Sequence, residues 1–115
     1  MSFLLDSHVL LWWLTPDPQL GVRYERILSD PHSEVFVSSI TIAELESKVS
    51  IGKLVMPNNV NQRVEENGFL SLPFTSRHAT VLRTLPLHHR DPFDRMLISQ
   101  AMTDYLRTIA AALRS

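Results

Sequence analysis

The chain opens with a short run of apolar residues that ends abruptly at a charge. Phe3, Leu4 and Leu5 follow one another without the alternation of polar and apolar residues that a half-exposed strand shows. Such a run is typical of a strand buried on both faces, as in a parallel sheet covered by helices. Asp6 ends the run, because an unpaired charge is costly deep in a core. We therefore predict that Asp6 lies where a central strand ends and a helix begins, at the edge where α/β sheets bind ligands.

Short apolar strands and longer helical segments alternate along the rest of the chain. A second buried strand is predicted at residues 34–38 and a third strand at residues 69–73. The Asp91-Pro92 pair is typical of a helix start, with an acidic N-cap followed by proline in the first turn. This alternation indicates an α/β fold with a parallel sheet. The predicted helices cover residues 7–14, 22–29, 39–51 (starting at Ser39 or Thr41), 60–67, 76–84 and 92–102.

The end of the chain has two interpretations. Residues 106–109 are compatible with a fourth strand, Leu-Arg-Thr-Ile. Apolar residues at i, i+4 spacing from Phe93 to Leu113 also fit one long helix that runs to the end. We predict the strand, because a sheet of three strands would leave an edge uncovered.

The composition limits the class of protein. At 115 residues the chain forms one domain, residues 1–115. Its formal net charge is −1, so any contact with nucleic acid would come from a local patch. The absence of cysteine excludes disulfides and thiolate metal sites. No apolar stretch is long enough to span a membrane and no basic signal segment precedes one, so we expect a cytoplasmic protein with no membrane partner.

Three carboxylates share one sequence context, early in a helix at the expected edge of the sheet: Asp6, Glu44 and Asp94. Two full charges roughly 5 Å apart repel by about 3 kcal/mol at an effective dielectric constant near 20, so a cluster of three requires a counter-charge. An oxygen-only site suits Mg²⁺ or Mn²⁺ rather than zinc, and substrate phosphate often completes its coordination. This pattern points to metal-assisted hydrolysis of a phosphodiester.

Each acid also has a structural interpretation. Asp6 could be an N-cap, and Thr41-Ile42-Ala43-Glu44 matches the capping box, in which Glu44 would bond back to the amide of Thr41. Asp94 near a helix start is favoured by the helix dipole alone. Taken singly, these interpretations stay open for all three acids.

Three stretches carry a family resemblance. Residues 4–12 (LLDSHVLLW), residues 38–45 (SSITIAEL) and residues 88–101 (HHRDPFDRMLISQA) resemble, in order and spacing, the acidic motifs of PIN-domain ribonucleases, particularly VapC-type toxins of bacterial toxin–antitoxin pairs. The resemblance extends over about residues 2–103. It implies a three-layer α/β/α fold around a parallel sheet of about four strands.

The resemblance also implies an activity. Asp6, Glu44 and Asp94 would be the metal-binding and catalytic acids of a Mg²⁺- or Mn²⁺-dependent ribonuclease. RNA would be the substrate, a cognate antitoxin would bind across the active-site groove, and the chain would form a homodimer. These statements come from the family and not from composition or spacing.

Residues beside the acids are candidates for supporting roles. Ser7 could orient Asp6, and Asp91 could join the site, although an N-cap role suits it better. Arg90 and Arg95 could contact RNA phosphates or form surface ion pairs. Trp12 and Trp13 could stack on bases, but packing in the core or a dimer interface is favoured, and His78, His88 and His89 do not have zinc-site spacing.

The C-terminal end departs from the family and is truncated or divergent. Family members usually have a threonine and a fourth aspartate after the last strand, whereas no acid follows Asp104 here. This difference motivates a second hypothesis, a catalytically impaired PIN domain retained as an antitoxin- or RNA-binding module. A third is another metal-dependent phosphohydrolase on a similar sheet.

Overall fold

The structure of the protein, a computed structural model, describes residues 1–86 and 91–110. Four parallel strands form one sheet in the order β3-β2-β1-β4. None of the helices in these two ranges has the length and apolar composition of a membrane span. The strands are β1 (Ser2–Leu5), β2 (Glu34–Ser38), β3 (Leu70–Leu72) and β4 (Arg107–Ile109). The helices are α1 (Ser7–Leu14), α2 (Val22–Ser29), α3 (Ser39–Ser50), α4 (Val60–Glu66), α5 (Ser76–Val81) and α6 (Pro92–Asp104), with short 3₁₀ helices η1 (Pro18–Leu20) and η2 (Leu82–Thr84).

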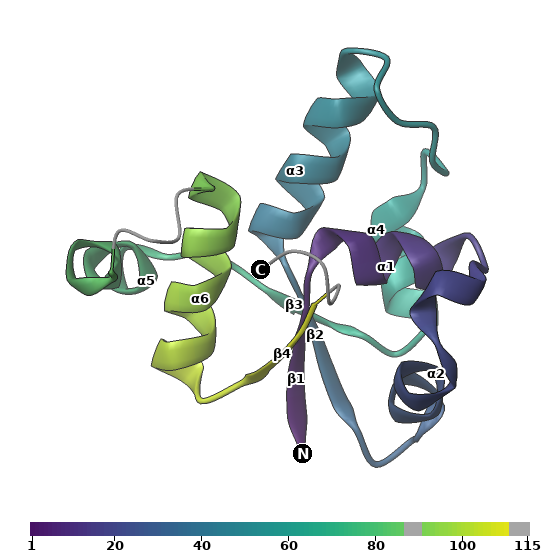
Figure 1. The fold of residues 1–115 in the computed structure, drawn as a ribbon, viewed down its shortest axis with the longest axis horizontal. Helices are drawn as coiled ribbons and strands as arrows, with labels where there is room; N and C mark the ends of the chain where they lie inside the picture. Colours follow the sequence, from purple (N-terminus) through teal and green to yellow (C-terminus); the bar gives the residue numbers. More distant parts are fainter. Residues whose placement is uncertain (87–90, 111–115) are drawn as a thin grey trace.

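The sheet lies between two layers of helices, with α1, α2 and α4 on one side and α5 and α6 on the other (Figure 1). Successive side chains of a strand point to opposite faces, so β1 contributes to both layers. Phe3 and Leu5 belong to the cluster that packs on α1, α2 and α4, while Leu4 between them is fully buried outside that cluster. The predicted α/β fold with a parallel sheet is therefore confirmed, as is the burial of its central strand β1 on both faces.

The predicted fourth strand is confirmed, and the alternative of one continuous helix is wrong. Helix α6 ends because Tyr105 adopts a left-handed conformation with φ of 56°. The N–H of Leu106 then donates to the carbonyl of Ala101, which closes the helix end, with an N···O distance of 2.9 Å. The chain turns back into β4, which pairs with β1. Residues 111–115 of the predicted tail lie outside the described residues.

Candidate functional site

Asp6 lies directly after β1, at the carboxyl edge of the sheet. Its N–H donates to the carbonyl of Ile109 at 3.0 Å, so Asp6 lies beside the end of β4. Its Oδ1 accepts the N–H of Val9 at 2.8 Å, and the residue is 2% exposed. The N-cap interpretation is therefore confirmed. It does not exclude a second role, because a carboxylate has about four lone-pair sites and this bond uses one of them.

Glu44 lies in the second turn of α3 and is 3% exposed. The capping box with Thr41 as N-cap is wrong, because the N-cap lies three residues earlier: the Oγ of Ser38 accepts the N–H of Ile40 at 3.0 Å. Thr41 is buried instead, and its hydroxyl donates to the carbonyl of Leu5 at 3.3 Å. This bond ties α3 to the end of β1, next to Asp6. The Glu44 carboxylate faces Lys48, whose Nζ lies 3.3 Å from Oε2.

Asp94 lies in the first turn of α6 and is half-buried. Asp91 caps this helix as predicted, since its Oδ1 accepts the N–H of Phe93 at 2.9 Å. Helix α6 runs back to β4, which is parallel to β1, so its first turn lies at the edge where the strands end. Figure 1 shows α1, α3 and α6 all beginning at this edge, and α3 packs against both of the others.

We call Asp6, Glu44 and Asp94 the acidic edge. Across residues 1–86 and 91–110, no three His, Cys, Asp or Glu side chains lie close enough together to hold one metal ion. Mg²⁺ is usually bound through one or two carboxylates, and water and substrate phosphate complete its coordination. The oxygen donors of the acidic edge fit an ion of this kind without forming a closed cage. Helix N-termini at the same edge stabilise ionised carboxylates and attract phosphate.

Two buried polar atoms lie beside Asp6 in the first turn of α1. The Oγ of Ser7 and the Nδ1 of His8 are inaccessible to solvent and have no hydrogen-bond partner within the described part of the chain. Native proteins leave few buried polar groups unsatisfied, so such atoms call for an explanation. Ser7 was expected near the site from its position after Asp6, whereas no sequence pattern singled out His8.

Of the two candidate arginines in the third motif, Arg95 is among the described residues and Arg90 is not. Arg95 ties α6 to Pro86 and to η2, since Nη1 donates to the carbonyl of Pro86 and Nη2 to that of Leu82, both at 2.9 Å. These bonds give Arg95 a structural role, and an RNA contact through it stays a prediction. Arg90, together with His88 and His89, lies outside the described residues.

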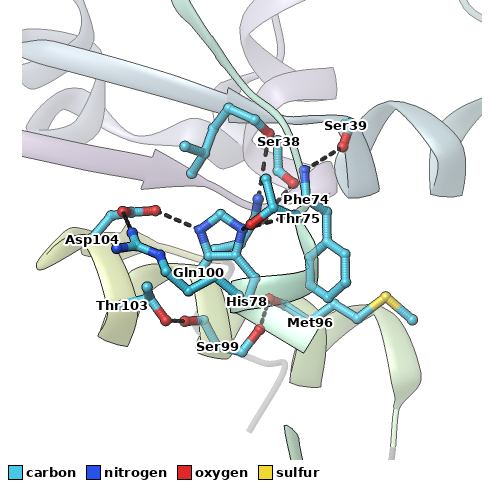
Figure 2. A network of polar contacts seen from close by, with 12 residues as sticks. Ser38, Ser39, Phe74, Thr75, His78, Met96, Ser99, Gln100, Thr103 and Asp104 are labelled. Atoms are coloured by element: carbon cyan, nitrogen blue, oxygen red, sulfur yellow. Dashed lines mark hydrogen bonds and ion pairs between the residues drawn. The ribbon is translucent and has the colours of Figure 1, made fainter. Parts of the chain in front are cut away.

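Gln100 is a buried residue of α6 that the sequence motifs did not identify as part of the site. Its Oε1 accepts the hydroxyl of Ser38, and its Nε2 donates to the carbonyl of Leu72 at 3.3 Å (Figure 2). Gln100 thus ties α6 to the ends of β2 and β3 and fixes the helix that carries Asp94. Its position three residues after the buried Leu97, on one helix face, was the available signal.

A second polar cluster joins α5 to the end of α6; it contains Thr75, Arg77, His78 and Asp104, and we call it the His78 network (Figure 2). The Nδ1 of buried His78 accepts the N–H of Thr75 at 3.0 Å. In the neutral ring Nε2 therefore carries the proton and donates to Asp104 Oδ2 at 2.7 Å. Arg77 Nη2 donates to the other oxygen of Asp104 at 2.9 Å. Asp104 is therefore engaged away from the acidic edge.

Comparison with known proteins shows the family to which the chain belongs. The family model of the PIN domain matches residues 3–111, so the chain belongs to the PIN-domain family. No curated protein matches the chain significantly.

Solved structures show the same fold. VapBC from Salmonella typhimurium, crystallised bound to DNA, is 21% identical with a TM-score of 0.64, and the match covers 99% of this chain and 89% of that one. VapBC2 from Rickettsia felis, bound to a promoter DNA fragment, is 15% identical with a TM-score of 0.63 and coverage of 94% and 86%. FitAB bound to the IR36 DNA fragment is 18% identical with a TM-score of 0.52 and coverage of 95% and 94%.

Proposed function

We propose that this PIN-domain protein is a divalent-metal-dependent endoribonuclease that acts as the toxin of a toxin–antitoxin pair. The observation that carries the proposal is the acidic edge. Asp6, Glu44 and Asp94 come from three segments far apart in the sequence, and each lies at the N-cap or in the first two turns of a helix that begins at the carboxyl edge of the sheet. In parallel α/β sheets this edge is where ligands bind.

The acidic edge would hold Mg²⁺ or Mn²⁺, with one or two of its carboxylates bound directly to the ion and the rest acting through water. When bound, such an ion neutralises charge on the scissile phosphate and lowers the pKa of water that attacks it. Oxygen donors at this edge suit these ions better than they suit zinc. Glu44 already faces one cation in the protein, the ammonium of Lys48, so its carboxylate is placed to bind positive charge.

The chain's own groups would orient the reacting parts. The bond from the Val9 N–H holds the carboxylate of Asp6 in one orientation, which lowers the entropy lost when it binds a ligand. The buried hydroxyl of Ser7 could donate a hydrogen bond to water or to phosphate at this edge. Burial of Asp6 and Glu44 strengthens their interactions with charge, since the local dielectric constant is lower than that of water.

The assignment as a toxin extends from the VapBC and FitAB structures that share the fold. We propose that the partner of this chain is a cognate antitoxin that covers the acidic edge, and that the chain forms a homodimer. RNA is the proposed substrate.

A second candidate function is a PIN domain that binds an antitoxin or RNA without cleaving it. The specific observation in its favour is Asp104, the last acid of the sequence, which is bonded to Arg77 and His78 and so is engaged elsewhere. Only the three acids of the acidic edge would then remain to hold a catalytic metal ion, which favours binding without cleavage.

An RNA-cleavage assay with Mn²⁺ separates the two candidates. We expect purified protein to cut RNA with Mn²⁺, to stop when EDTA is added, and to lose activity in Glu44→Gln. Glu46→Gln is a matched control, because Glu46 lies two residues further along α3 and is exposed. Activity that survives Glu44→Gln would contradict the proposed nuclease site, and absence of activity in the wild-type protein would favour the binding module.

A further inference from the structure

A cavity of about 540 Å³ lies at the C-terminal end of α1, between α1, η1, α2 and α4. Its volume is in the range of small-ligand sites. The acidic edge is at the opposite end of α1, about 9 Å away along the helix axis between Asp6 and Trp12. The residues that matter for its chemistry are Trp12, Trp13, Pro16, Asp17, Glu25 and Arg63.

The aromatic walls of this cavity are held in place. The indole Nε1 of Trp13 donates to Asn67 Oδ1 at 3.0 Å, and its ring packs on Phe69 with a centroid separation of 6.0 Å. The ring of Trp12 packs against His8 at 6.0 Å. Fixed indole rings that remain partly exposed offer apolar, electron-rich surfaces to a guest.

The charges around the cavity favour a cation. Asp17 and Glu25 contribute two carboxylates, and Glu25 has no side-chain partner among residues 1–86 and 91–110. Arg63, the one cationic lining residue among residues 1–86 and 91–110, donates from Nη2 to the carbonyl of Leu14 at 2.8 Å and caps the end of α1. No ion pair joins Arg63 to either carboxylate within the described ranges.

We propose that this cavity is a docking site for an arginine side chain presented by a segment of a partner protein. A guanidinium group stacks on indole faces and binds carboxylates through paired hydrogen bonds, which matches the walls and the rim described above. An RNA base could stack on the same indoles, but two carboxylates would repel its phosphates. The inference stands independently of the proposed nuclease activity, since none of these residues belongs to the acidic edge.

The two tryptophans provide the test, because they are the only ones in the chain and both line the cavity. We would titrate the protein with N-acetyl-arginine amide, at constant ionic strength and up to about 50 mM, a range suited to a ligand of this size. N-acetyl-citrulline amide is the matched probe, since it has the same shape without the charge. Tryptophan fluorescence and the two indole N–H signals in NMR spectra report binding.

We expect the arginine probe to shift both indole signals and to bind about 5-fold more tightly than the citrulline probe, the upper end of the range for one partly exposed charge contact. Glu25→Gln should reduce this preference to about 2-fold or less. Glu46→Gln, an exposed charge removal on α3, should leave it unchanged. Equal binding of the two probes, a short oligouridylate that shifts the indoles more strongly than arginine does, or equal effects of the two variants would overturn the proposal.

Discussion

The two polar regions at the ends of α6 differ in how completely their hydrogen bonds are made. In the His78 network both ring nitrogens of His78 and both oxygens of Asp104 have partners at 2.7–3.1 Å. At the acidic edge, buried Ser7 Oγ and His8 Nδ1 have none within the described part of the chain. Both regions contain buried ionisable groups, so burial alone does not distinguish them.

The difference indicates what each region does. A fully bonded polar network fixes structure, because breaking any member leaves another buried group unsatisfied. A buried polar atom beside carboxylates and without a partner suits a site completed by a ligand. We therefore infer that the His78 network stabilises the packing of α5 on α6 and that the acidic edge binds the substrate and its ion. The following changes test this contrast, from the largest expected effect to the smallest.

Asp6→Asn should have the largest effect on activity. It keeps the shape and the N-cap acceptor but removes the negative charge, so we expect RNA cleavage with Mn²⁺ to fall by at least about 100-fold. Thermal unfolding should change little, because asparagine is an equally good N-cap. Cleavage rates at matched folded fractions provide the measurement, and an unchanged rate would contradict the assignment of Asp6.

His78→Ala should act on stability instead. Loss of the ring leaves the N–H of Thr75 without a partner and removes the bond to Oδ2 of Asp104, so we expect unfolding to become easier by about 2 kcal/mol. Arg77→Gln is the control on the same aspartate. The Arg77 side chain is 70% exposed, so this change should have an effect below about 0.5 kcal/mol.

Urea unfolding of both variants, together with their cleavage rates at 25 °C, shows whether these residues contribute to stability or to cleavage. The contrast between the regions would fail if folded His78→Ala protein, or folded Asp104→Asn protein, lost cleavage activity as Asp6→Asn does. That outcome would make Asp104 part of the catalytic machinery.

Ser7→Ala should separate activity from stability in one residue. A buried hydroxyl without a bond contributes nothing to offset its desolvation, so its removal should leave stability unchanged or raise it by up to about 1 kcal/mol. Cleavage should fall by about 10-fold if the hydroxyl orients Asp6, water or phosphate. A drop in stability with unchanged cleavage, measured by the same two assays, would assign Ser7 to the fold.

Lys48→Gln should have the smallest effect. The Lys48 side chain is 40% exposed, so its ion pair with Glu44 contributes only a few tenths of a kcal/mol to stability. Since the ammonium competes for the carboxylate, we expect Mn²⁺ to bind about 2-fold more tightly in the variant. Calorimetric titration against Lys53→Gln, an exposed lysine near the same helix, checks this, and weaker binding would count against Glu44 as a ligand.

Local sequence patterns were sufficient to predict most of the fold. The uninterrupted run Phe3–Leu5 predicted a strand buried on both faces, and Asp91-Pro92 predicted the start of α6, because these signals act within a few residues. The start of α3 was ambiguous for a physical reason: Ser38, Ser39 and Thr41 can each cap a helix. The helix uses Ser38, whose hydroxyl also donates to Gln100, 62 residues away.

The site was predictable in outline but not in detail. The alternation of strands and helices, with each acid early in a helix, implied one edge of the sheet, since parallel strands end together. The pairing of Glu44 with Lys48 was visible as an i, i+4 pattern. Contacts between distant segments, such as Thr41 with Leu5 and His78 with Asp104, could not be predicted because they depend on the tertiary packing.

The most direct test of the account is where Mn²⁺ binds, observed through the broadening of backbone amide signals in NMR spectra. Substoichiometric Mn²⁺ should broaden the signals of Ser7, Ala43 and Asp94 and leave those of Arg77 and Asp104 sharp, since Asp104 lies about 15 Å from Asp94 along α6. Asp6→Asn should remove the broadening. Broadening centred on the His78 network, or none at the first turns of α1 and α6, would contradict the account.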